Sequence, residues 1–248
     1  MELLGIDVGG SGIKGALVDA DSGELNTDRI RIETPQPAKP KAVIGTIVEL
    51  IEQFEYSGPV GVGFPAVILD GVVMSAANVD YRWIHYPGVK GISEAIGQQV
   101  ALVNDADAAG IAEMTFGAGK DRRGVVMVLT LGTGIGSALF INGVLVPNTE
   151  LGHIFMRNRK IDAEDYTTNR IRKKKNLSWK EWAGRLDKYL HYLEGLFSPN
   201  LFIVGGGVSK KHNKFIPLLT VRTEVVPAEL LNEAGIVGAA MAAKALLG

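Results

Sequence analysis

Apolar residues in the first half of the chain form short runs that predict strands separated by helices. Apolar or alternating runs bounded by Gly, Pro or Asp predict strands at 2–8, 13–19, 29–34, 60–64 and 100–103. Apolar positions recur every three or four residues over 42–54, which predicts a helix. Further helices are predicted over 92–99 and 106–116.

The second half repeats this pattern. Strands are predicted at 124–131, at 137–146 with a turn at Asn142-Gly143, and at 201–204. Ser178 and Glu181 have the spacing of a capping box, which predicts the start of a long helix over 178–197. A helix of small residues over 234–247 closes the chain. Alternating strands and helices of this kind predict an α/β fold.

Two segments half a chain apart share one plan. Residues 7–18 (DVGGSGIKGALV) and 130–141 (TLGTGIGSALFI) each read as a strand, a glycine-rich turn and a second strand. This internal repeat predicts two similar lobes with a cleft between them.

Composition narrows the class of protein. Glycine accounts for 31 of 248 residues, about 12%, where roughly 7% is usual, and this favours tight turns or close backbone approaches. The net charge of −1 argues against a general nucleic-acid binder. There is no cysteine, so disulfides, a thiolate nucleophile and cysteine-ligated zinc are excluded. No apolar stretch is long enough for a leader or a membrane span, so we expect a cytoplasmic protein without a membrane partner.

The first glycine loop matches a dinucleotide fingerprint but favours another chemistry. Residues 10–15 fit G-x-G-x-x-G, yet a strand is predicted to follow, where the fingerprint needs a helix. A hairpin of small residues can instead direct backbone N–H groups at a phosphate. Ser11, Thr133 and Lys14 would add donors, and Asp7 would orient Mg²⁺ directly or through water. The alternative is two tight hairpins without a ligand.

Three motifs together resemble the ROK family of sugar kinases. They are residues 7–14 (DVGGSGIK), 131–136 (LGTGIG) and 150–153 (ELGH), and the resemblance covers essentially the whole chain. It implies the two-lobed actin-like ATPase (ribonuclease H-like) fold with a cleft between the lobes. On this fold, residues 1–104 would form a small lobe with the helix at about 234–248 packed back on it, and 105–233 the large lobe. The family also implies a homodimer.

Within that family, the chain is most similar to members that phosphorylate glucose with inorganic polyphosphate. Four segments carry the likeness: 104–109 (NDADAA), 201–208 (LFIVGGGV), 221–223 (VRT) and 232–240 (NEAGIVGAA). Typical ROK members place a zinc site of one His and three Cys after the Glu-x-Gly-His motif. Here His153 stands without cysteines, so that zinc site cannot form.

The resemblance implies a role for each site residue. Asp105 would be the catalytic base; read from the residues alone, it is equally a helix cap. The sugar contacts would be Asn104, Asp105, Glu150, His153, Glu164 and, more weakly, Asn78. The phosphate and nucleotide contacts would be Asp7, Gly9, Gly10, Ser11, Gly12, Lys14, Gly132, Thr133, Gly134, Gly205, Gly206 and Gly207, with Mg²⁺ at Asp7.

Three clusters of basic residues suit a long polyanion. Residues 157–175 hold eight Lys and Arg, including Arg157, Arg159 and Lys160. Two smaller clusters are Lys120, Arg122 and Arg123, and Lys210, Lys211 and Lys214. A basic stripe leading to a phosphate site would bind polyphosphate largely through charge. The alternative is an ordinary solvated surface.

The expected reaction is transfer of a terminal phosphoryl group from polyphosphate to the 6-hydroxyl of glucose, giving glucose 6-phosphate, with Mg²⁺ and with ATP left open as a second donor. One alternative is an ATP-dependent hexose or N-acylhexosamine kinase. Another is a non-catalytic sugar sensor on the same scaffold.

Overall fold

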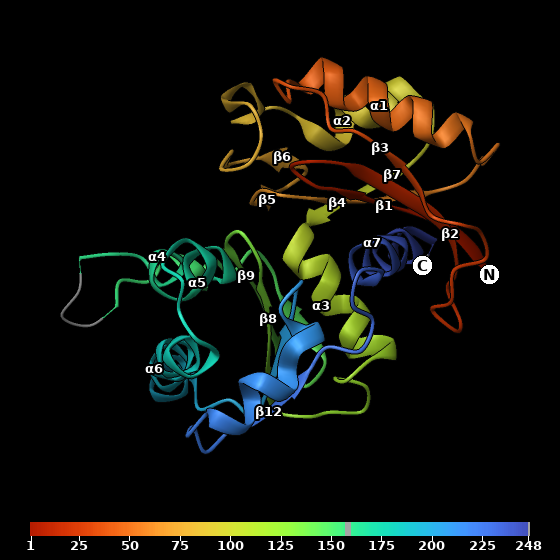
Figure 1. Cartoon of the computed structure of the whole chain (residues 1–248). Coiled ribbons are helices and arrows are strands. Elements are labelled where there is room, and N and C mark those ends of the chain that lie inside the picture. Colours follow the sequence, from red (N-terminus) through yellow and green to blue (C-terminus); the bar gives the residue numbers. More distant parts are fainter. Residues whose placement is uncertain (157–159, 248) are drawn as a thin grey trace. The chain divides into compact units, whose positions relative to one another are not determined.

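The computed structural model describes residues 1–156 and 160–247 and divides them into two compact units. Unit 1 comprises Met1–Ala112 with Glu233–Gly248, and unit 2 comprises Glu113–Asn232. Each unit contains one five-stranded sheet (Figure 1). The lobe boundary predicted between residues 104 and 105 remains a prediction. The predicted cleft between the two lobes also remains a prediction.

The sheet of unit 1 has the order β3-β2-β1-β4-β7. Its strands are β1 (Glu2–Val8), β2 (Ile13–Asp19), β3 (Ile30–Ile32), β4 (Val60–Phe64) and β7 (Val100–Asn104). Strand β1 pairs antiparallel with β2 and parallel with β4, which in turn pairs parallel with β7. The carboxyl ends of β1, β4 and β7 therefore share one edge, where open α/β sheets bind ligands.

Helices cover both faces of this sheet. Helices α1 (Pro40–Glu52) and α2 (Gly88–Ile96) lie on one face and α7 (Ala234–Lys244) on the other (Figure 1). The core between the sheet, α1 and α2 includes the fully buried Phe64 and Trp83.

Helix α7 reaches the sheet through backbone rather than side chains. A Cβ on Gly5 would overlap the carbonyl of Ile236, and a Cβ on Gly61 would overlap that of Ala239. A Cβ on Gly238 would overlap the carbonyl of Ala108 in α3 (Asp105–Phe116), within unit 1. Glycine at these positions is therefore required by close approach.

The sheet of unit 2 has the order β10-β9-β8-β11-β12. Its strands are β8 (Val125–Leu131), β9 (Ile135–Ile141), β10 (Val144–Val146), β11 (Leu201–Gly205) and β12 (Glu224–Pro227). Strand β8 pairs antiparallel with β9 and parallel with β11. The central part of this topology matches unit 1, in agreement with the internal repeat.

The described residues of unit 2 include the helices α4 (Ala163–Thr167), α5 (Asn169–Lys174) and α6 (Trp179–Phe197). The predicted capping box is confirmed, because Ser178 Oγ accepts from the N–H of Glu181 and the Glu181 carboxylate accepts from the N–H of Ser178. Buried Trp182 and Phe215 lie in the core of this unit.

Several predicted boundaries are wrong, and some elements were not predicted. Helix α2 spans 88–96 rather than 92–99, because Gly97 is left-handed (φ 70°) and ends the helix. The closing helix ends at Lys244 and continues as a 3₁₀ turn, Ala245–Leu247. Strands β5 (Ile68–Leu69), β6 (Val72–Val73) and β12, and helices α4 and α5, were not predicted because they are too short to show a period. No helix among the described residues is long and apolar enough to cross a membrane.

Candidate active site

The glycine loop of unit 1 closes the β1–β2 hairpin, as predicted, and no helix follows it. The N–H of Gly9 donates to the carbonyl of Gly12 (3.0 Å). Arg31 Nη2 donates to the carbonyl of Ser11 (2.6 Å). Two more side chains donate to loop carbonyls, namely Thr34 to Gly9 and Gln36 to Gly10. Because these carbonyl oxygens already accept hydrogen bonds from the protein, the loop is suited to bind an anion through its backbone N–H groups.

Asp7 and Lys14 face each other across the same hairpin. Their backbones are register partners in β1 and β2, and Lys14 Nζ lies 3.1 Å from Asp7 Oδ2. A Cβ on Gly235 would lie 3.0 Å from Asp7 Cγ, so Asp7 also lies against the first turn of α7. A carboxylate is stabilised at that positive end of the helix. Lys14 is thus held by Asp7 rather than projecting as an isolated positive charge.

The glycine loop of unit 2 has a matching construction. The N–H of Gly132 donates to the carbonyl of Gly134 (3.0 Å). Arg170 Nε donates to the carbonyl of Thr133 (2.9 Å). In the first loop, Arg31 donates in the same way to the carbonyl of Ser11, which also carries a hydroxyl group. The sequence repeat is therefore matched in hydrogen bonds, and the two loop-binding arginines were missed because both lie distant in sequence.

The third loop begins where β11 ends. Gly206 has a positive φ of 77°, and a Cβ there would lie 2.8 Å from the backbone N and O of Leu131. Ser209 donates to the carbonyl of Gly206 through both its N–H and its hydroxyl. Gly205, Gly206 and Gly207 thus form a tight turn beside the end of β8.

Asn104, rather than Asp105, supplies the side chain that caps α3. Asn104 Oδ1 accepts from the N–H groups of Ala106 (2.8 Å) and Asp107 (3.1 Å), and its Nδ2 donates to the carbonyl of Ala66 (3.1 Å). Asn104 is 7% exposed, and its hydrogen bonds anchor the first turn of α3; its predicted contact with a sugar stays a prediction. Asp105 follows at the start of α3, half-buried, at the carboxyl end of β7.

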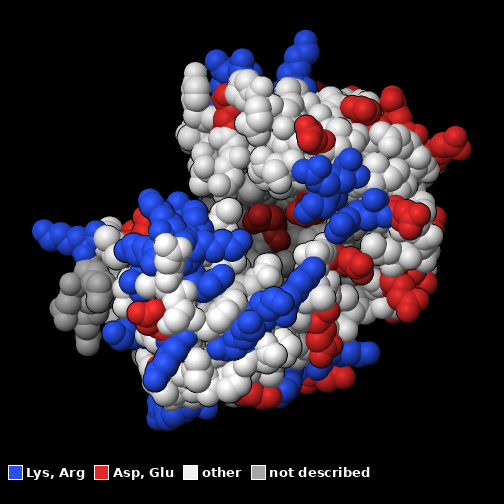
Figure 2. All heavy atoms as spheres, in the orientation of Figure 1, with Lys and Arg blue, Asp and Glu red and all other residues white. Residues whose placement is uncertain are grey.

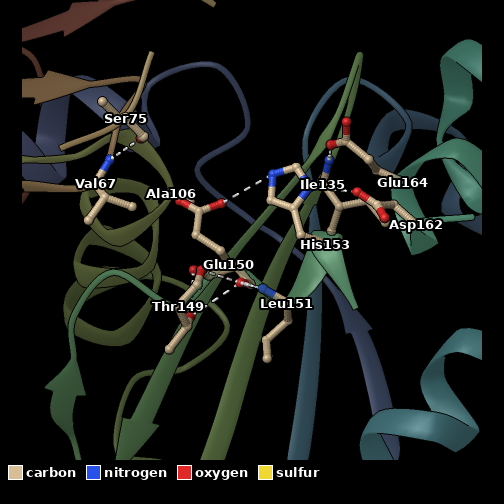
Figure 3. Close-up of polar contacts among 12 residues, drawn as sticks. Val67, Ser75, Ala106, Ile135, Thr149, Glu150, Leu151, His153, Asp162 and Glu164 are labelled. Atoms are coloured by element: carbon tan, nitrogen blue, oxygen red, sulfur yellow. Dashed lines mark hydrogen bonds and ion pairs between the residues drawn. The ribbon is translucent and has the colours of Figure 1, made fainter. Parts of the chain in front are cut away.

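Unit 2 brings a histidine and three carboxylates together (Figure 3). His153, in the 3₁₀ turn Leu151–His153, lies between Glu150 and Asp162. Its Nδ1 is 3.0 Å from Asp162 Oδ2, and its Nε2 is 3.9 Å from Glu150 Oε2. Glu164, in α4, accepts from the N–H of Ile135 (3.3 Å), with its Oε2 2.6 Å from where a Cβ on Gly134 would be. The predicted residues Glu150, His153 and Glu164 therefore lie together beside the second glycine loop.

The surroundings of this cluster raise the pKa values of His153 and Glu150. The hydrogen bond with Asp162 raises the pKa of His153, opposed by partial burial and assisted by Glu164 and Glu150. Partial burial raises the pKa of Glu150; His153 lowers it, and Glu164 raises it. Sequence reasoning missed Asp162, whose carboxylate is the hydrogen-bond partner of His153 Nδ1.

The remaining predictions concern Asn78, two arginines and the Mg²⁺ site at Asp7. Asn78 is exposed, and its carbonyl lies 4.0 Å from where a Cβ on Gly10 would be, so it lies beside the first glycine loop. Arg157 and Arg159 lie outside the described residues.

Within the described ranges, no group of three or more His, Cys, Asp or Glu is arranged to hold a metal. A lone Asp7 still fits Mg²⁺, which binds through one or two carboxylates together with substrate phosphates.

The chain belongs to the ROK family, whose model matches residues 3–164. It is 51% identical over 243 residues to a polyphosphate glucokinase of Mycobacterium tuberculosis (strain CDC 1551 / Oshkosh), covering 98% of this chain and 91% of that protein. Two solved structures are also similar, and they confirm the actin-like ATPase fold.

The first solved structure is an inorganic polyphosphate/ATP-glucomannokinase from Arthrobacter sp. strain KM. It is 46% identical, with a TM-score of 0.93 over 100% of this chain and 99% of that chain. The second is a ROK family glucokinase from Streptomyces griseus in complex with glucose and AMPPNP. It is 25% identical, with a TM-score of 0.82 over 97% of this chain and 98% of that chain.

Replacing Asp162 with Asn is expected to lower the pKa of His153 toward its ordinary value of about 6.5, because the charge that stabilises the imidazolium is removed. A raised folded-state pKa stabilises the protein below the unfolded-state pKa, and this contribution is lost as the pH rises through the folded-state value. The variant should therefore lose more stability at pH 5.5 than at pH 8, by under about 1 kcal/mol at this solvent-exposed pair.

The measurement is an NMR titration of His153 with urea unfolding at the two pH values. The control is Asp165→Asn, which removes a carboxylate of the same segment that pairs with Arg170. An equal drop in the His153 pKa in both variants would contradict the assignment.

Proposed function

We propose that the protein is a polyphosphate glucokinase, transferring the terminal phosphoryl group of inorganic polyphosphate to the 6-hydroxyl of glucose. The observation that carries this proposal is 51% identity over 98% of the chain to a polyphosphate glucokinase. The two matched glycine loops and the cluster around His153 support it, because a sugar kinase needs both phosphate-binding backbone and polar groups for sugar hydroxyls.

In the proposed mechanism, Asp105 accepts the proton of the 6-hydroxyl as that oxygen attacks the terminal phosphorus. The bond from phosphorus to the bridging oxygen of the donor breaks, and the shortened polyphosphate leaves. Phosphoryl transfer depends mostly on positioning and charge neutralisation, so an aligned carboxylate of ordinary basicity is sufficient. Asn104 acts chiefly by fixing the first turn of α3, on which Asp105 is carried.

Glu150, His153 and Glu164 are proposed to bind the sugar. Adjacent sugar hydroxyls need paired donors and acceptors, which an imidazole flanked by carboxylates supplies. The hydrogen bond with Asp162 raises the pKa of His153 and so favours the protonated form, in which both ring nitrogens can donate. Because Nδ1 is directed to Asp162, Nε2 is the nitrogen suited to a sugar hydroxyl.

The glycine loops are proposed to bind the donor phosphates, with Asp7 holding Mg²⁺. The metal would neutralise charge on the transferred group. Mannose as a second acceptor and ATP as a second donor join the proposal, since the similar Arthrobacter protein is a polyphosphate/ATP-glucomannokinase. A homodimer is also proposed, from family resemblance alone. A cytoplasmic location is proposed because the sequence has no cysteine to form disulfides.

Steady-state kinetics with matched donors test the proposal. We expect glucose 6-phosphate from glucose with Mg²⁺ and polyphosphate, and no product when glucose or donor is omitted. Product from ATP alone would favour an ATP-dependent hexose kinase. Sugar binding without product from either donor would favour a non-catalytic sensor.

A further inference from the structure

The second and third glycine loops lie side by side in unit 2. Gly205 pairs with Thr130 at the end of β8, immediately before the loop at 132–134. The adjacent Gly206 lies so close to Leu131 that a side chain would collide with its backbone. Two turns suited to phosphates therefore share one end of the sheet.

Each of these loops is joined to a basic segment. The loop at 132–134 is bound by Arg170 of α5, through its Nε and through a backbone hydrogen bond to Gly132 (3.3 Å). Helix α5 continues with Arg172, Lys173 and Lys174, and Lys175 follows at its C-terminal end. The third loop runs directly into the 3₁₀ segment Ser209–Lys214, which holds three lysines.

The two basic segments meet at Trp179, the first residue of α6. The guanidinium of Arg172 lies 4.1 Å from the centroid of this ring. Lys214 Nζ lies 5.9 Å from the same centroid. Clusters that are almost forty residues apart in sequence thus form one surface, here called the basic track: residues 172–175 with Lys210, Lys211 and Lys214.

Carboxylates are absent from the sequence that forms this surface. No Asp or Glu occurs between Asp165 and Glu181, or between Glu194 and Glu224. The bordering acids are engaged: Asp165 pairs with Arg170, and Glu181 closes the capping box of α6. Figure 2 shows Lys and Arg side chains gathered over the part of unit 2 where α5 and residues 209–214 lie. The lysines of the track are exposed.

We propose that the basic track binds the distal part of a long inorganic polyphosphate chain whose end lies in the glycine loops. This inference rests on the proposed function and extends it from the reacting phosphoryl group to the rest of the donor. A flexible polyanion bearing one charge or more on every unit binds such a row of cations by releasing counterions. Short donors would reach only the loops.

Trp179, where the two parts of the basic track meet, argues against a nucleic acid as the ligand. Single-stranded nucleic acids bind where bases stack on open aromatic faces. The Trp179 ring instead has Arg172 over it and stacks with Phe215 at a centroid distance of 6.1 Å and an interplanar angle of 15°. The ring therefore acts as a spacer that holds the cations, and a ligand without bases fits best.

The test uses two double variants of the full chain, Lys173→Gln/Lys174→Gln and Lys210→Gln/Lys211→Gln. With long-chain polyphosphate, each should raise KM about tenfold with kcat unchanged, and make the dependence of log(kcat/KM) on log salt shallower by about 1.4, or roughly 0.7 per lost charge. With tripolyphosphate or ATP, the kinetics should match the wild type. The control, Lys41→Gln/Lys90→Gln, removes equal charge from exposed positions on α1 and α2.

Three results would overturn the inference. They are unchanged kinetics with long chains, an equal loss with short donors, or single-stranded RNA displacing labelled polyphosphate from the wild type at lower concentration than unlabelled polyphosphate. Failure of the proposed function looks different: the wild type itself would make no glucose 6-phosphate from polyphosphate. Binding of labelled polyphosphate to wild type and variants then still decides whether the track exists.

Discussion

The Asp105→Asn variant is expected to lose about 10²–10⁴-fold in kcat while binding glucose as the wild type does. Asn keeps the size of the side chain and its place at the start of α3 but cannot accept the proton of the sugar hydroxyl. The cap of α3 is unaffected because Asn104 makes it. Steady-state kinetics and calorimetric titration with glucose measure the two quantities.

The matched control is Asp70→Asn, the same chemical change at an exposed residue with a positive φ of 50°. Asn tolerates that backbone conformation, so activity and stability should both be retained. If Asp105→Asn turned over like this control, Asp105 would not be the base. Loss of glucose binding with loss of turnover would indicate a binding role instead.

Replacing Gly61 with Ala is expected to destabilise the protein by about 3 kcal/mol or more, a large share of a typical total of about 5–15 kcal/mol. The new methyl group would overlap the carbonyl of Ala239, and backbone in a packed helix and strand cannot move as a flexible side chain can. Helix α7 would have to shift away from β4. Urea unfolding of purified protein, or the soluble yield if none is recovered, measures the effect.

Gly45→Ala is the opposite substitution and serves as the control. Gly45 lies in α1 with no atom within 4 Å of its added Cβ. Alanine there should stabilise the helix by about 0.5–1 kcal/mol. Two variants of equal stability would refute the close approach of α7 as the reason for glycine at position 61.

Local patterns predicted the central strands and the long helices. Period and turn chemistry are enough for β1, β2, β4 and α6, whose cap is signalled by two residues three apart. The pairing of Asp7 with Lys14 was not predicted, although the predicted antiparallel hairpin has a register that brings these two residues opposite each other. Short elements such as β12 and α5 exist through tertiary contacts and leave no local period.

The site was predicted less completely, because its partners come from distant segments. Nothing in the sequence ties Arg31 to Ser11, Arg170 to Thr133, or Asp162 to His153. Asn104 and Asp105 show a second limit of prediction from sequence. Either side chain can cap a helix, and only the structure assigns this task to Asn104.

The placement of α7 against β1 and β4 sets the order in which the chain can become structured during synthesis. Unit 2 is continuous in sequence, whereas the sheet of unit 1 is completed by a helix that is translated only after the whole of unit 2. Unit 2 can therefore fold as it leaves the ribosome. One face of the unit 1 sheet stays without its helix until α7 has been translated, so a nascent chain stalled before residue 233 exposes that face to chaperones.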